Sequence, residues 1–268
     1  MTDSQKQGRV LLNILSIPSP GEIFAALNTP CHPNWVTLVT PATAPITTDR
    51  AQLALAMGVQ AANGYIAMEA QDGQQVKNVG TEMMVLAKAL GLSANLMGRE
   101  KSLIEFAERN EWNALRAALK ATENGITTAM IDQKDQDLVI LTAASTWLRE
   151  MEIATQIVLT SDALQGCSIV RQPKAARELS SQLDTLPERM QKGLLVSAMK
   201  QTLDETAILM ETMGATPETE KPALQRIHDE MAGLVKKILT SPDAKPLPSP
   251  VVPLPVQPPA ATQAVIKP

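Results

Sequence analysis

Histidine and cysteine, the side chains that most often bind metals or act as nucleophiles, are scarce in this sequence. The chain holds two of each: His32, His228, Cys31 and Cys167. A di-iron helical bundle needs Glu-x-x-His pairs, but Thr29 and Gln225 stand three positions before the histidines. A structural zinc site needs four ligands, and the adjacent Cys31 and His32 have no second pair. We therefore predict no metal site and no cofactor.

Each of these residues also has a simple packing interpretation, which we adopt. His228 lies next to an apolar stripe and is interpreted as a residue on the flank of a helix. The pair Cys31-His32 lies between prolines and is interpreted as a packed loop. The alternative for this pair, a nucleophile or a haem ligand, has no partner residue that the sequence identifies.

Motifs for phosphate binding and serine catalysis are absent as well. There is no Gly-Lys dipeptide, no glycine spacing of the dinucleotide-binding kind, and no Gly-x-Ser-x-Gly turn. Asp132, Asp135 and Asp137 resemble part of a calcium loop but lack its glycine, so we interpret them as a turn between helices. We predict that the protein is not an enzyme; a cleft gathering acids such as Glu69 and Glu82 around a desolvated position would reopen the question.

A run of amides and acids follows the middle of the first long predicted helix. Its members are Gln60, Asn63, Glu69, Gln71, Asp72, Gln74, Gln75 and Asn78. They either line a polar groove or form a solvated helix face, and we adopt the second interpretation. Thirteen methionines favour an adaptable core and, as the alternative, a hydrophobic ligand pocket.

The composition argues against nucleic acid as a partner. Lys and Arg number 24 against 28 Asp and Glu, which leaves a formal charge of −4 and no excess of basic residues to neutralise phosphates. Aromatic residues make up 2% of the chain, too few for platforms on which single-stranded bases stack. We expect a protein partner or a homo-oligomer instead.

No apolar stretch of the sequence looks like a signal peptide or a transmembrane segment. The stretch from Val10 to Ile17 is interrupted by Asn13, and the run from Leu138 to Trp147 is well below the ~18 residues of a spanning helix. We expect a cytoplasmic protein, or a periplasmic or secreted one if a signal was removed before Met1. A disulfide between Cys31 and Cys167 fits only the second alternative, and idle thiols are our prediction.

The positions of the prolines divide the chain into three parts, because proline inside a helix costs ~3 kcal/mol. Six of the 19 prolines lie in residues 18–45, none in 46–172, and nine in 242–268. We predict the following organisation: an irregular arm over 1–46 with a short helix at 20–28, a helical bundle over 47–240, and a disordered Pro-rich tail over 241–268.

Apolar residues of the central part recur every three or four positions, which is the spacing of one face of an α-helix. One such stripe is Val76, Val79, Met83, Leu86 and Leu90. We predict helices near 49–72, 74–90, 94–100, 103–109, 111–133, 137–161, 174–185, 188–212 and 218–239. Since no β pattern competes, the predicted fold class is all-α, with antiparallel helical hairpins forming a bundle.

Three small residues, Ala54, Gly58 and Ala62, share one face of the first long helix. A face without bulky side chains lets the backbone of another helix approach closely. This face is either an oligomer seam or packing within the chain. We adopt packing within the chain.

Two segments within residues 49–125 resemble uncharacterised helical bacterial proteins that are associated with export. They are Tyr65-Ile-Ala-Met-Glu-Ala-Gln-Asp72 and Phe106-Ala-Glu-Arg-Asn-Glu-Trp-Asn-Ala-Leu115. The resemblance covers less than half of the chain and contains no catalytic motif, so it implies no function. It favours the alternative in which a signal peptide was removed before Met1.

Two hypotheses on function follow from these patterns. The first is a non-enzymatic structural or protein-interaction module that binds its partner through the N-terminal arm or through residues 241–268, whose prolines have the spacing of polyproline ligands. The second is a carrier or sensor that holds a small apolar ligand between methionine-rich helices.

Overall fold

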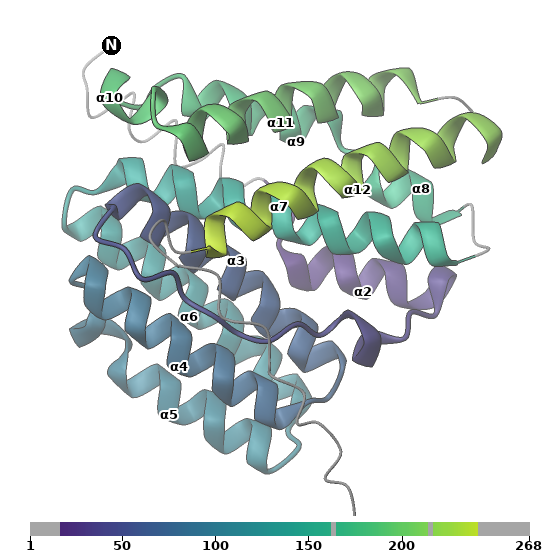
Figure 1. Cartoon of the computed structure of the whole chain (residues 1–268). Coiled ribbons are helices and arrows are strands. Elements are labelled where there is room, and N and C mark those ends of the chain that lie inside the picture. Colours follow the sequence, from purple (N-terminus) through teal and green to yellow (C-terminus); the bar gives the residue numbers. More distant parts are fainter. Residues whose placement is uncertain (1–16, 162–164, 214–216, 241–268) are drawn as a thin grey trace, which may run out of the picture.

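The computed structural model describes residues 17–161, 165–213 and 217–240, and the predicted tail over 241–268 lies outside them. The described part is helical, without strands, which confirms the all-α class (Figure 1). Its elements are α2 (Pro20–Cys31), the 3-10 helix η1 (Trp35–Leu38), α3 (Arg50–Glu69), α4 (Gly73–Leu90), α5 (Ser93–Glu108), α6 (Trp112–Asp132), α7 (Gln136–Thr160), α8 (Gln165–Val170), α9 (Pro173–Leu183), α10 (Glu188–Gln191), α11 (Leu194–Thr212) and α12 (Pro217–Leu239).

Two predicted helix boundaries are wrong. A break was expected near Ser102, but α5 continues through it because Leu103 and Ala107 extend its buried face. A single helix was expected over 188–212, but α10 and α11 are separate elements. Gly193 has φ −63° and ψ 137°, an extended conformation that ends the helical path. The short helix α8 had no prediction.

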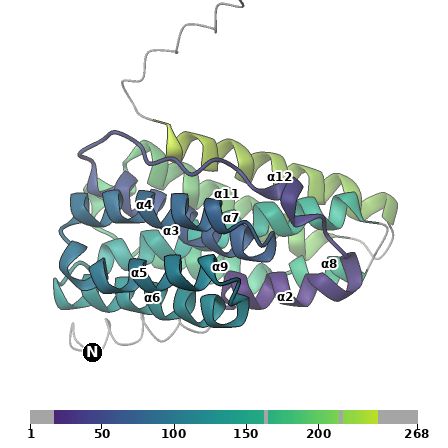
Figure 2. The same cartoon turned by 90° about the horizontal axis from the view of Figure 1, so that it is seen from below.

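The centre of the fold is the pair α3 and α7, which run parallel: Ala54, Gly58 and Asn63 meet Thr142, Thr146 and Arg149 in the same order. Every residue of α3 from Gln52 to Met68 is buried, and α7 is buried along most of its length. The helices α4, α5 and α6 pack on one side of this pair, and α12 lies on the other, followed by α11 and α9 (Figures 1 and 2). A helix surrounded in this way needs apolar residues all round, which the sequence of α3 provides.

The two central helices come closest at Gly58. A Cβ atom at this position would lie 2.2 Å from the backbone oxygen of Thr142 and 2.2 Å from Oγ of Ser145. The hydroxyls of Thr142 and Thr146 donate hydrogen bonds of 3.2 Å to the backbone oxygens of Ala54 and Gly58. The predicted close approach on this face is confirmed, and α7 of the same chain makes it.

An extended segment, residues 39–49, connects η1 to α3 and lies across α3 and α4 (Figure 1). Gln60 donates a 2.6 Å hydrogen bond to the Thr43 carbonyl, and Gln75 donates one to the Thr40 carbonyl. Extended backbone without a neighbouring strand needs such donors for its carbonyls. The interpretation as a solvated face is therefore wrong for Gln60, Asn63 and Gln75, which are buried, whereas Gln71, Gln74 and Asn78 of the same run are exposed.

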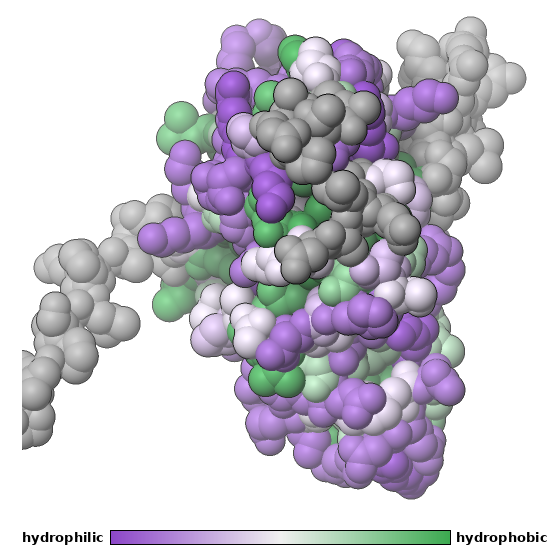
Figure 3. Space-filling model, turned by 90° about the vertical axis from the view of Figure 1, so that its right-hand side faces the viewer, coloured by the Kyte–Doolittle hydropathy of each residue, from purple (hydrophilic) through white to green (hydrophobic). Residues whose placement is uncertain are grey.

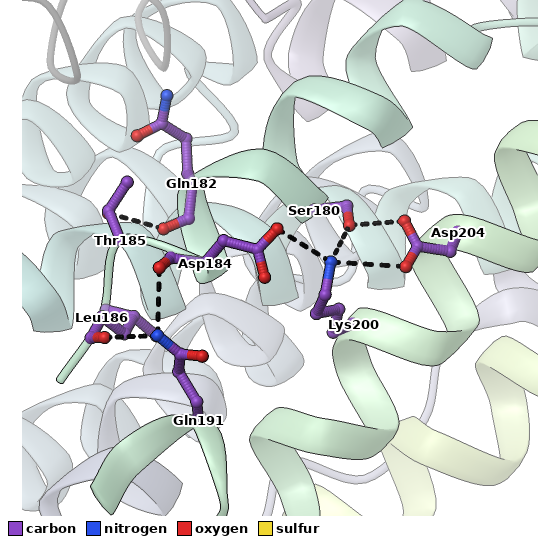
Figure 4. A network of polar contacts seen from close by, with 8 residues as sticks. All are labelled: Ser180, Gln182, Asp184, Thr185, Leu186, Gln191, Lys200 and Asp204. Atoms are coloured by element: carbon purple, nitrogen blue, oxygen red, sulfur yellow. Dashed lines mark hydrogen bonds and ion pairs between the residues drawn. The ribbon is translucent and has the colours of Figure 1, made fainter. Parts of the chain in front are cut away.

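A polar network joins α9 to α11 on the outside of the molecule (Figure 4). The ammonium group of Lys200 lies 3.0 Å from Oδ2 of Asp184, 3.0 Å from Oγ of Ser180 and 3.4 Å from Oδ2 of Asp204. Exposed ion pairs contribute about 0–1 kcal/mol each. Packing of buried side chains, among them Leu179 of α9, is therefore the main force that holds this hairpin together.

Hydrophobic residues are visible in a band across the middle of one face of the molecule, between two hydrophilic ends (Figure 3). The ends carry the outer helices of the two sides, and the band marks the level of the central pair. Within the described ranges, no helix is both long enough and apolar enough to pass through a membrane.

Candidate functional site

Glu150, in the middle of α7, is a carboxyl group inside the protein without a hydrogen-bond partner. The residue is 1% exposed, and neither Oε1 nor Oε2 has a partner. An unsatisfied buried polar group costs about 1–3 kcal/mol, and more when it is charged. Such a group in a folded protein requires a specific explanation, such as a role in binding or catalysis.

Glu150 lines a cavity of about 190 Å³ between α2, α3, α6 and α7. The apolar part of its wall includes Ile126 of α6 and Val139 and Trp147 of α7. Thr127 and Asn124 add polar groups from α6. An apolar cavity of about 150 Å³ is known to hold benzene, so this one has room for a molecule of about that size.

The outer end of the cavity carries a pair of opposite charges. Nζ of Lys120 lies 3.6 Å from Oε1 of Glu22, and these side chains are 58% and 59% exposed. Glu22 also accepts a 2.8 Å hydrogen bond from the backbone N–H of Ser19, in the capping box that begins α2. This bond is the main reason why the pKa of Glu22 is lowered, so Glu22 is ionised at neutral pH.

A second acid, Glu123 of α6, lines the cavity together with Glu150. The hydroxyl of Tyr65, on α3, donates a 3.2 Å hydrogen bond to Oε2 of Glu123. Burial, and then the charge of Glu123, raise the pKa of Tyr65. The Tyr65 hydroxyl therefore stays protonated and acts as the hydrogen-bond donor. Burial also raises the pKa of Glu123, and the hydrogen bond from Tyr65 opposes this effect.

The pKa of Glu150 is raised well above that of an ordinary carboxyl group. Burial is the largest cause, followed by the negative charges of Glu123 and Glu22. A cavity that contains a residue with a strongly perturbed pKa is a candidate binding or catalytic site. We therefore take the cavity lined by Glu150 as the candidate site of this protein.

The raised pKa of Glu150 predicts how stability depends on pH. The unfolded group has a pKa near 4.5, so below that pH both states are protonated and the group costs no ionisation energy. Stability then falls as the pH rises from the unfolded to the folded value, by about 1.4 kcal/mol per pH unit. We expect Glu150→Gln, which cannot ionise, to match the wild type at about pH 4 and to exceed it at pH 8.

Urea unfolding at several pH values measures this difference. Glu205→Gln is the control, because hydrogen bonds lower the pKa of Glu205 and its effect has the opposite sign. A stability gain of Glu150→Gln that stays constant between pH 4 and pH 8 would contradict the raised pKa.

The acids named from the sequence do not form this site. Glu69 pairs with Arg116 at 2.6 Å and accepts a hydrogen bond from Asn28. Glu82 lines a separate groove beside residues 39–42. The sequence does contain a signal for Glu150 that catalytic motifs do not reveal: from Leu138 to Val158 the only charged residues are Arg149, Glu150 and Glu152.

His32, His228 and Cys31 are not among the residues that line the cavity. Nδ1 of His228 is 3.0 Å from the backbone oxygen of Glu152, on the inner flank of α12, as predicted. The helix expected at 20–28 continues through Pro30 to Cys31, so the interpretation as a loop is wrong for Cys31, a buried free thiol, while His32 follows the helix with φ 45°. The Cys167 side chain is outside the described residues. Among those that are described, no group of three or more His, Cys, Asp or Glu residues is arranged to hold a metal ion.

The three aspartates that resemble part of a calcium loop lie at the turn between α6 and α7. Asp135 immediately precedes α7 and forms an ion pair with Arg50 of α3. This arrangement agrees with the interpretation as a turn between helices.

Comparison of the chain with models of protein families, with curated proteins and with solved structures finds no match. The resemblance of residues 49–125 to helical bacterial proteins stays a prediction. A function for this chain is therefore argued from the chemistry of its cavity.

Proposed function

We propose that this protein is a non-enzymatic carrier or sensor that binds a small molecule in the cavity lined by Glu150. The unpartnered carboxyl group of Glu150 is the observation that carries the proposal. A ligand with a hydrogen-bond donor supplies the partner that the described residues do not provide. In the empty protein the unsatisfied carboxyl group of Glu150 is unfavourable. A ligand that forms a hydrogen bond with it removes this cost, and the gain contributes to the affinity for the ligand.

The neighbours of Glu150 support binding rather than catalysis. The hydroxyls of Thr142 and Thr146 donate to backbone oxygens of α3, so they are structural groups. A nucleophile needs a general base within hydrogen-bond distance. The hydroxyl and carboxylate of Ser19 and Glu22 are such a pair in the cavity lining, but they form the capping box that begins α2 and are therefore structural groups as well.

The ligand we propose differs from the apolar one suggested by the abundance of methionine. No methionine is among the described residues that line this cavity, and buried methionines such as Met57 and Met151 fill the core instead. The cavity combines an apolar wall with carboxyl groups, which favours a ligand with an apolar body and a polar end.

Native mass spectrometry of the full chain, isolated from the cells that produce it, tests this function. We expect a stoichiometric adduct with the mass of a small molecule. Ala143, a half-buried residue of the cavity wall, offers a blocking variant: Ala143→Phe fills the space and is expected to abolish the adduct.

The matched control is Ala198→Phe, because Ala198 is also half-buried but belongs to α11 and does not line the cavity. This variant is expected to keep the adduct. The proposed function is contradicted if the isolated wild type carries no small molecule, or if Ala143→Phe retains it.

The protein-interaction module remains the second candidate, because several large apolar side chains are exposed. Leu194 of α11 is 90% exposed, and it borders a groove of about 570 Å³ together with Met190 and Leu195. Ile46, in the extended segment of the N-terminal arm, is 86% exposed. The same mass spectrum separates the candidates, since this one requires a second polypeptide or a second copy of the chain in place of the small adduct.

A further inference from the structure

We propose that the ligand of this cavity is a small organic ammonium ion, with its positive charge placed between the carboxyl groups of Glu150 and Glu123. The inference rests on the proposed function and names the chemical class of the ligand. Its basis is the charge balance of the cavity, the number of hydrogen bonds that its acids leave open, and the size of the space.

The positive groups near the cavity are already paired. Lys120 lies 3.6 Å from Glu22 at the outer end, and Arg116 lies 2.6 Å from Glu69. Glu123 accepts a hydrogen bond from the neutral hydroxyl of Tyr65 and also feels the charge of Lys120, whereas Glu150 has no partner. Among the described residues, Lys120 therefore serves both Glu22 and Glu123, and none adds a further positive charge at Glu150.

An ammonium group suits these acids better than other donors. It carries up to three N–H donors, whereas an alcohol has one, so it can bond to both carboxyl groups at the same time. Hydrogen bonds between charged groups are also shorter and stronger than neutral ones. An anionic ligand would be repelled by the charges of Glu22 and Glu123.

The size of the cavity limits the body of this ligand. About 190 Å³, with Ile126, Val139 and Trp147 in the wall, fits an apolar group of about the size of one six-membered ring. Cyclohexylamine, which is protonated at neutral pH, is therefore a suitable probe, and cyclohexanol is its neutral counterpart of nearly the same shape.

Binding of the ammonium ion is expected to release a proton. Burial, and then the charges of Glu123 on α6 and Glu22 on α2, raise the pKa of Glu150, and the charge of Glu150 acts in turn on Tyr65 of α3. Lys120 of α6 is the cation in the lining of the same cavity. A ligand cation beside Glu150 favours its ionised form, so binding lowers this pKa. Affinity should increase with pH, and the apparent binding enthalpy should depend on the ionisation enthalpy of the buffer.

Isothermal titration calorimetry of the full chain with the two probes at neutral pH tests the proposal. We expect cyclohexylamine to bind at least about tenfold more tightly than cyclohexanol. Glu150→Gln should remove this preference while circular dichroism shows an unchanged helix content. Glu82→Gln, a change to a carboxyl group in a separate groove, should leave the affinity unchanged.

Three other outcomes would overturn the assignment of the ligand as a small organic ammonium ion. If cyclohexanol binds as tightly as the amine and Ala143→Phe blocks it, the cavity binds small molecules but not as an ammonium site, and the proposed function stands. If cyclohexylamine does not bind, the ammonium assignment fails, and the native mass spectrum decides separately on the function. If Nα-acetyl-lysine methylamide binds in its place, the ligand is a lysine side chain of a partner protein.

Discussion

Adding one methyl group at Gly58 is expected to lower the free energy of unfolding by about 3 kcal/mol or more. The new Cβ of Gly58→Ala would lie 2.2 Å from the backbone oxygen of Thr142, and a backbone atom cannot turn aside as a side chain can. Overpacking of a core usually costs about 1–3 kcal/mol, and this contact lies between the two central helices. Chemical denaturation monitored by circular dichroism measures the loss.

Gly233→Ala is the matched control for this substitution. Gly233 lies inside α12, is exposed, and a Cβ there meets nothing within 4 Å. The same chemical change is therefore expected to stabilise the protein by up to about 1 kcal/mol, because alanine has the higher helix propensity. Equal effects at the two positions would show that α3 and α7 do not approach each other as described.

Replacing Arg149 by methionine is expected to cost about 3–5 kcal/mol, the usual result of removing one partner of a buried ion pair. Arg149 is 3% exposed, and its Nη1 lies 2.7 Å from Oε1 of Glu152. Its Nε donates to Asn63 and its Nη2 to Thr40, so it joins α7 to α3 and to the extended segment. Arg149→Met leaves the Glu152 carboxyl group alone in the interior.

Thermal and urea unfolding measure this effect, and an exposed pair serves as its control. Arg50→Met removes a pair with Asp135 whose side chains are 51% and 30% exposed, and we expect it to cost less than about 1 kcal/mol. The double variant Arg149→Met/Glu152→Met should recover part of the loss, because it leaves no unpaired charge. Similar losses for Arg149→Met and Arg50→Met would contradict the role of the buried pair.

These variants distinguish groups that support the fold from a group that weakens it. Arg149 and Gly58 lie where α3 and α7 meet, and changing either disturbs the centre of the molecule. Glu150, next to Arg149 in the chain, faces the cavity instead and has no partner there. Its replacement by glutamine is expected to increase stability at high pH, which is typical of a site where binding has been favoured over stability.

The helices and one helix contact could be predicted from the sequence by itself. Apolar residues spaced by three and four positions, as in α4, determine which face of a helix is buried, and this pattern is a local property of the chain. Proline marks where such helices cannot run, and the short helix predicted from residue 20 begins there, after a capping box of Ser19 and Glu22. The small side chains around Gly58 predicted the close approach of another helix, although not which one.

Only the tertiary structure decided what the polar residues do. Gln60 and Asn63 have the composition of a solvated face, and they are buried because the extended segment and Arg149 supply partners from distant parts of the chain. Glu123 and Glu150 belong to different helices, and nothing near either residue in the sequence indicates that both line one cavity. The energy of a carboxyl group depends on its solvation and on nearby charges, and the packing of α2, α3, α6 and α7 determines both.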